Sequence, residues 1–143
     1  MAKSLKFTDE TYLDSNSIIH NKETLKNILD SKVIYESGSN GNGSWIKYAD
    51  GTMVCNKYVS GTTDVTTKWG SLYEGSIRCG DYPQPFIEKP FVHATPVNGN
   101  GNLIQCFGSN QNETTFGTLY ITLPSSFASR AYSINLRAEG KWK

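Results

Sequence analysis

Hydrophobic and polar residues alternate with a period of two through much of the second half of the chain. The clearest stretch is 116–123, in which Leu119 and Ile121 share one face while Thr118 and Tyr120 share the other. Successive side chains of a strand point to opposite faces of a sheet, so this alternation predicts a half-buried strand. We predict further strands, each bounded by turn residues, at 45–49, 52–59, 71–79, 91–97, 103–107 and 132–138.

The stretch 44–59 predicts a β-hairpin around which the rest of the chain is organised. Asp50 and Gly51 are expected to form a two-residue type I′ turn, because glycine accepts a positive φ and aspartate tolerates one. Directly paired residues share a face of the sheet. The register expected from this turn therefore places four residues on one face, in the pairs Ile46 with Cys55 and Tyr48 with Met53.

The segment 81–90 contains three of the five prolines. Proline cannot donate to the hydrogen-bond ladder of a central strand, so we expect a rigid extended loop there. No helical pattern of about 10 to 15 residues separates the predicted strands, which argues against a parallel α/β sheet. Short strands joined by turns predict a mainly β fold, an antiparallel sandwich or a barrel.

The first part of the chain has a different pattern. Residues 1–35 carry only short apolar pairs and one short helical stretch at 21–31, in which Leu25, Ile28 and Leu29 fall on one face. A helix of this length is marginal alone in water, so it needs a partner surface. The segment 36–44 is rich in Gly, Ser and Asn and predicts a flexible linker. We therefore expect a neck at 1–35, a linker at 36–44 and a β-domain at 45–143.

Charge and composition exclude several classes of protein. The net charge is +1, with 14 basic and 13 acidic residues spread along the chain, so the basic stripe of a nucleic-acid-binding protein is missing. No apolar run approaches the about 18 residues of a membrane span, and the start lacks the apolar segment of a signal peptide. We expect synthesis in the cytoplasm. The three cysteines fit neither a disulfide framework nor a zinc site, and we expect buried reduced thiols.

Candidate chemistry is sparse. Asp81, Glu88 and Glu113 are loop carboxylates that a glycosidase would need in pairs, but we favour their interpretation as solvated surface charges. His20 and His93 lie in no nucleophile motif, and the spacing indicates no metal site or cofactor, unless His20 meets copies of itself on a symmetry axis.

Saccharide binding has the most support among the chemical options. It needs an aromatic ring for the apolar sugar face and short polar side chains for the hydroxyls. The candidate ligand-binding residues in predicted loops are Trp69, Asp81, Tyr82, Asn110, Gln111, Asn112 and Glu113. The alternative for Trp69 and Tyr82 is an anchoring role in the core or an interface, and we assign Trp45 and Trp142 to packing.

Four stretches of the sequence resemble one family. The segment GSWIKYADGTMVC resembles the opening of the C-terminal domain of phage tail fibre and receptor-binding proteins, especially those of low-GC Gram-positive hosts. TYLDSNSIIHNKETLKNIL is similar to the neck before such domains, and YPQPFIEKPFVHATP to their middle stretch. The ending AEGKWK resembles their last strand, with Glu139 where an apolar residue is usual.

The resemblance implies a homotrimer with a thin neck and a jelly-roll-like β-sandwich head. It also implies attachment of a virion or tail-like particle to a host cell-surface carbohydrate, together with other tail or baseplate proteins, and no enzymatic activity. Two alternatives remain at this stage. One is a structural fibre-tip or decoration protein that binds no receptor, and the other is a polysaccharide-degrading enzyme. Exposure of Trp69 and Tyr82 together in one groove would favour receptor binding over the structural role.

Overall fold

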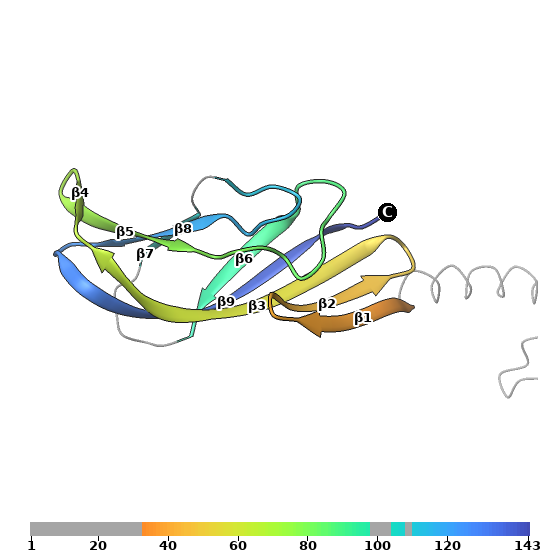
Figure 1. Cartoon of the computed structure of the whole chain (residues 1–143). Coiled ribbons are helices and arrows are strands. Elements are labelled where there is room, and N and C mark those ends of the chain that lie inside the picture. The colour runs from red at the N-terminus through yellow and green to blue at the C-terminus, as the bar shows by residue number, and fades with distance from the viewer. Residues whose placement is uncertain (1–32, 98–103, 108–109) are drawn as a thin grey trace, which may run out of the picture.

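The structure is a computed structural model that describes residues 33–97, 104–107 and 110–143. This part of the chain is all β and contains no helix (Figure 1). Its strands are β1 (Ile34–Asn40), β2 (Gly43–Tyr48), β3 (Thr52–Val65), β4 (Thr67–Trp69), β5 (Leu72–Arg78), β6 (Phe91–Pro96), β7 (Ile104–Phe107), β8 (Thr118–Leu123) and β9 (Phe127–Lys141). No helix able to span a membrane was found among these residues.

The strands form two antiparallel sheets (Figure 1). One has five strands in the order β1-β2-β3-β9-β6, and the other has four in the order β4-β5-β8-β7. The long strands β3 and β9 pair from Thr52 with Lys141 to Val65 with Phe127, so they run the length of the domain. The described chain begins at the same end of the domain at which it finishes, and β4 lies at the opposite end.

The core lies between the two sheets, and both contribute their inward-facing residues to it. Strand alternation explains the pattern, because the core residues alternate along β8 (Leu119, Ile121 and Leu123) and along the second half of β9 (Ile134, Leu136 and Ala138). The two loops beside the sheets, 79–90 and 110–117, close the core with aromatic residues. The buried cluster consists of Met53, Cys55, Val65, Ile77, Cys79, Tyr82, Phe86, Phe116, Leu119, Ile121, Leu123, Ile134, Leu136 and Ala138.

Most of the strand predictions are confirmed. Strands β5, β6, β7, β8 and β9 overlap the five segments predicted downstream of the hairpin, and the proline-rich segment is a loop. Trp45 and Trp142 pack against the core as expected. Cys55 and Cys79 are buried free thiols.

The predicted register of the central hairpin is wrong by one residue. β2 and β3 do pair, but Ile46 lies opposite Val54 and Trp45 opposite Cys55. The cause is the turn, in which the Gly51 amide donates to the Tyr48 carbonyl oxygen at 3.1 Å and Gly51 has a φ of 88°. A type I turn followed by a left-handed glycine adds one residue to the loop.

The segment 36–44 is not a linker. It forms most of β1, the turn at Gly41 and Asn42, and the start of β2, and it is therefore part of the five-stranded sheet. The predicted helix at 21–31 and the rest of the expected neck, up to residue 32, lie outside the described residues.

Candidate functional site

Tyr82 lies in the core. Its side chain is 4% exposed, and its ring packs edge-on against Phe86 and at a tilt against Phe116. A saccharide needs an accessible ring on which to stack, so the assignment of Tyr82 to a surface binding site is wrong. The alternative, an anchoring role in the core, is correct for this residue.

The remaining loop candidates lie close together. Asp81 forms an isolated bridge with Thr115, and the Phe86 amide donates to the Glu113 carbonyl oxygen at 2.9 Å. The loop that begins at Asp81 therefore runs beside the segment 110–115. The structure thus brings together five of the seven predicted residues: the exposed Asp81, Asn110, Asn112 and Glu113 and the half-buried Gln111.

Much of the polar chemistry of that loop is used internally. The side-chain oxygen of Asn112 accepts hydrogen bonds from the backbone amides of Thr114 and Thr115 at 2.8 and 3.1 Å, and from the Thr114 hydroxyl. This arrangement is an Asx-type turn, in which a side chain substitutes for a backbone acceptor. The Asn112 amide therefore shapes its own loop.

Trp69 lies far from these residues. It ends β4, where it pairs with Leu72, and its side chain is 59% exposed. Trp69 therefore lies beside the start of β5, whereas Asp81 comes shortly after the end of this seven-residue strand. A strand of this length spans roughly 20 Å at about 3.3 Å per residue. Trp69 and Tyr82 are consequently not exposed together in one groove.

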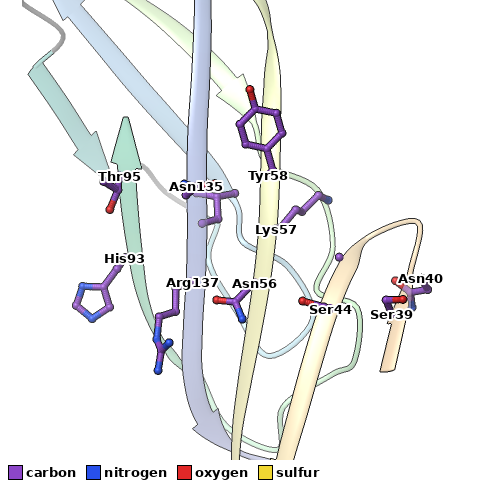
Figure 2. Close-up of a pocket in the computed structure, with 12 residues that line it drawn as sticks. Ser39, Asn40, Ser44, Asn56, Lys57, Tyr58, His93, Thr95, Asn135 and Arg137 are labelled. Atoms are coloured by element: carbon purple, nitrogen blue, oxygen red, sulfur yellow. The ribbon is translucent and has the colours of Figure 1, made fainter. Parts of the chain in front are cut away.

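A shallow hollow of about 660 Å³ lies on the outer face of the five-stranded sheet, and none of the sequence-based candidates lines it. It spans β1, β2, β3, β9 and β6 (Figure 2). The lining is mostly polar: Ser39, Asn40, Gly43, Ser44, Asn56, Lys57, Tyr58, His93, Thr95, Asn135, Leu136 and Arg137. Serine, threonine, amide, imidazole and guanidinium groups thus converge on one open surface.

The register of the sheet arranges these side chains in two rows (Figure 2). Directly paired residues share a face, so the order along each row follows the pairing of the strands. The first row runs Ser39, Ser44, Asn56, Arg137 and His93, and the second runs Tyr58, Asn135 and Thr95. Tyr58 is 57% exposed and supplies the only aromatic ring other than His93 in the lining.

Two charged contacts define the electrostatics of the hollow. Arg137 donates to the Glu139 carboxylate at 3.2 Å, and both side chains are about half exposed. Lys57 pairs with Leu136 and shares its inward face, and its ammonium donates to the Asp81 carbonyl oxygen at 3.3 Å. Lys57 therefore supports the neighbouring loop, and Arg137 is the cation that faces the hollow.

The described residues contain no group of three His, Cys, Asp or Glu side chains able to hold a metal ion. Burial raises the pKa of the Cys55 thiol to about 11 and also raises the pKa of Cys79. A thiol with a raised pKa is protonated and unreactive at neutral pH. These cysteines are therefore core residues. The side chains of the outer face offer groups for hydrogen bonding, stacking and ion pairing.

Part of this site can be read from the sequence. The inward assignment of Ile134 and Leu136 implies that Asn135 and Arg137 point outward. What the sequence does not indicate is that β9 lies between β3 and β6, which brings Asn56 and His93 to either side of Arg137.

No family model matches the sequence, and no curated protein matches it. Among solved structures, the fold is similar to that of an N-truncated R1-type pyocin tail fibre, with a TM-score of 0.51 and 16% sequence identity. The alignment covers 82% of this chain and 94% of that chain. The chain shares the fold of a tail-fibre fragment. A longer P. aeruginosa R1 pyocin fibre structure, of C-terminal residues 323–701, gives a TM-score of 0.43 at 14% identity, covering 97% of this chain and 34% of that one.

Proposed function

We propose that this chain is the C-terminal, receptor-binding part of a tail fibre, and that it attaches a phage or tail-like particle to a carbohydrate on a bacterial surface. The hollow on the outer face of the five-stranded sheet is the observation that carries the proposal. The similarity in fold to a pyocin tail fibre and the sequence resemblance to tail fibres of Gram-positive phages support the same role. We assign the protein to the virion tail, after synthesis in the host cytoplasm.

The outer face has the chemistry that a saccharide requires. The exposed ring of Tyr58 offers a flat apolar surface for the CH face of a sugar. Asn135 lies directly opposite Tyr58, and Asn56 lies in the next row, so two amides share this face of the sheet with the ring. Amides donate and accept hydrogen bonds at once, which suits hydroxyl groups. Because sheet positions are fixed by the backbone ladder, little ordering is needed on binding.

A trimeric assembly is part of the proposal. Large apolar side chains are exposed at the end of the domain where the described chain begins, and a partner subunit would cover them. They are Val33, Ile34, Tyr35, Ile87 and Phe91, and Phe91 is 80% exposed. Light scattering at low concentration tests this directly. A mass near three times 15.9 kDa is expected, and a monomer would contradict the trimer.

The proposal also includes a jelly-roll-like connectivity for the sandwich. In support, β9 pairs with β3 and β6 in one sheet while β8 pairs with β5 and β7 in the other. In each sheet a strand from the end of the chain thus lies between two strands from earlier in the sequence, and this connectivity is typical of a Greek-key arrangement. Residues 1–32 would connect this head to other tail or baseplate proteins.

Binding of labelled protein to bacterial cells, and to the polysaccharide extracted from them, tests the proposed function. We expect Tyr58→Ala to weaken binding about tenfold, because stacking of one ring contributes roughly 1 to 1.5 kcal/mol. Trp69→Ala is the matched control, since it removes an exposed aromatic from the opposite end of the domain and should leave binding unchanged.

The same experiment separates the two alternative functions. A structural fibre-tip protein would bind no surface polysaccharide from any strain. A polysaccharide-degrading enzyme would release reducing ends, and Asp81→Asn or Glu113→Gln would abolish that release. We propose that the protein binds and does not cleave, so intact polysaccharide should be recovered after prolonged incubation.

A further inference from the structure

We propose that the ligand of the outer-face hollow is an acidic saccharide, and that Arg137 binds its carboxylate. This inference rests on the proposed function and narrows it to one class of sugar. The position of Arg137 is the starting point, because it lies in the first polar row with Asn56 on one side and His93 on the other.

The charge balance of the hollow favours an anion. None of its twelve lining residues is Asp or Glu, whereas a guanidinium and an imidazole lie side by side on β9 and β6. Figure 2 shows Arg137 and His93 extending from the same face of the sheet. A site for neutral hydroxyls alone needs no cation, and the carboxylate in contact with Arg137, that of Glu139, lies outside the lining of the hollow.

The contact with Glu139 shows that the Arg137 guanidinium is placed to bind a carboxylate. Glu139 lies two residues further along β9 and accepts one hydrogen bond from the Arg137 guanidinium at 3.2 Å. The guanidinium has five N–H donors in a planar fork, and this fork can bind a carboxylate through two parallel hydrogen bonds. A half-exposed ion pair of this kind is weak, so an incoming carboxylate can share or replace it.

The relative positions of Arg137 and Tyr58 on the sheet indicate where the charge lies on the ligand. Tyr58 pairs with Asn135, so Arg137 is its diagonal neighbour on the adjacent strand. Diagonal neighbours on a sheet face are about 7 to 8 Å apart. This spacing applies to the Cα and Cβ positions, and Figure 2 shows the Tyr58 ring and the Arg137 side chain pointing away from each other. A sugar stacked on Tyr58 and the carboxylate bound by Arg137 therefore belong to different units of one saccharide chain.

Two acidic polymers, polygalacturonate and alginate, are suitable test ligands, each compared with its carboxyl-reduced neutral form. We expect at least one native polymer to bind, and its reduced form to bind about tenfold more weakly. Arg137→Gln should lower affinity for the native polymer about tenfold or more, since a hydrogen bond to a charged group is lost. Arg137→Lys should give an intermediate loss, because lysine keeps the charge but lacks the fork.

The strongest test is a substitution that should raise the affinity for the acidic polymer. Glu139→Gln removes the competing carboxylate, so affinity for the acidic polymer should rise up to about fivefold. Arg78→Gln is the matched control for Arg137→Gln, because Arg78 is an exposed arginine on β5 of the other sheet. It makes the same change in net charge and should alter affinity less than twofold.

Four results would overturn the inference while leaving the proposed function intact. The first three are equal binding of native and reduced polymers, equal effects of Arg137→Gln and Arg78→Gln, and binding to bacterial cells without binding to either acidic polymer. Preference for phosphorylated dextran over both uronates would also overturn it, since the charge would then be a phosphate. Failure to bind cells or any extracted polysaccharide would instead overturn the proposed function itself.

Discussion

The ring of Tyr35 stacks on the ring of Trp142, with their centroids 4.9 Å apart and their planes inclined at 30°. Tyr35 lies at the start of β1, and Trp142 is the penultimate residue of the chain. The Trp142 indole also donates to the Tyr48 carbonyl oxygen at 3.1 Å, and its backbone amide donates to Gly51. The C-terminal residues therefore attach the first hairpin to the end of the five-stranded sheet.

Trp142→Ala should lower the free energy of unfolding by about 2 kcal/mol, because it removes a half-buried aromatic ring and a hydrogen bond. Urea denaturation at a fixed protein concentration measures this change. Trp69→Ala is the control, since the Trp69 side chain is 59% exposed and its removal should change stability by less than about 0.5 kcal/mol. Equal losses for the two variants would show that Trp142 does not fasten the hairpin.

Tyr82→Phe should leave stability unchanged or raise it by up to about 1 kcal/mol. The Tyr82 hydroxyl is buried and has no hydrogen-bond partner within the described part of the structure, so its removal relieves a desolvation penalty. The comparison is Tyr58→Phe, which removes an exposed hydroxyl. Thermal unfolding of both variants measures the difference. A clear loss of stability in Tyr82→Phe would mean that the hydroxyl has a partner, and weaker saccharide binding would reopen its role in the site.

Gly75→Ala should destabilise the protein by about 2 kcal/mol through overpacking. A Cβ at Gly75 would collide with the backbone carbonyl oxygen of Asp64 and lie 3.0 Å from Val65 Cγ2, where β3 crosses β5. Gly41→Ala is the matched control, because a Cβ there meets nothing within 4 Å. Chemical denaturation of the pair tests the close approach of the two strands, and similar stabilities would contradict it.

Stability should fall at alkaline pH because of the buried thiol at Cys55. Burial raises its pKa to about 11, whereas a thiol in the unfolded chain ionises near pH 9. Above pH 9 the unfolded state thus loses a proton that the folded state keeps, so stability decreases as pH rises toward 11. Unfolding in urea at pH 7.5 and pH 10.5 measures the loss, which should be about 2 kcal/mol smaller in Cys55→Ala. Identical pH dependence in the two proteins would contradict the burial of this thiol.

The sequence predicts the strands well where alternation is strict, as in β8 and β9, because burial of one sheet face forces a period of two. It fails at Gly51, since an Asp-Gly pair suits two kinds of turn and the choice between them shifts the register by one residue. It also fails at 36–44, whose Gly, Ser and Asn composition is typical of a linker but forms a hairpin when the neighbouring strand pairs with it.

The candidate site was harder to predict than the fold. Asn135 and Arg137 are recognisable as outward-facing residues of β9, but their neighbours come from strands that are distant in sequence. Tyr82 shows the opposite problem, because a proline-rich loop suggests exposure, while its ring packs inward against Phe116. Non-local strand pairing and loop packing decide both cases, and neither leaves a local sequence signal.

Hydroxyl-radical footprinting of the full chain, with and without polysaccharide extracted from a strain that binds it, tests the central claim most directly. Radicals oxidise exposed aromatic and imidazole side chains, and a bound ligand protects them. Binding at the outer face should lower the oxidation of Tyr58 and His93 and leave Trp69 unchanged, since Trp69 lies at the far end of the other sheet. Protection of Trp69 with continued oxidation of Tyr58 would contradict the account and place the ligand elsewhere.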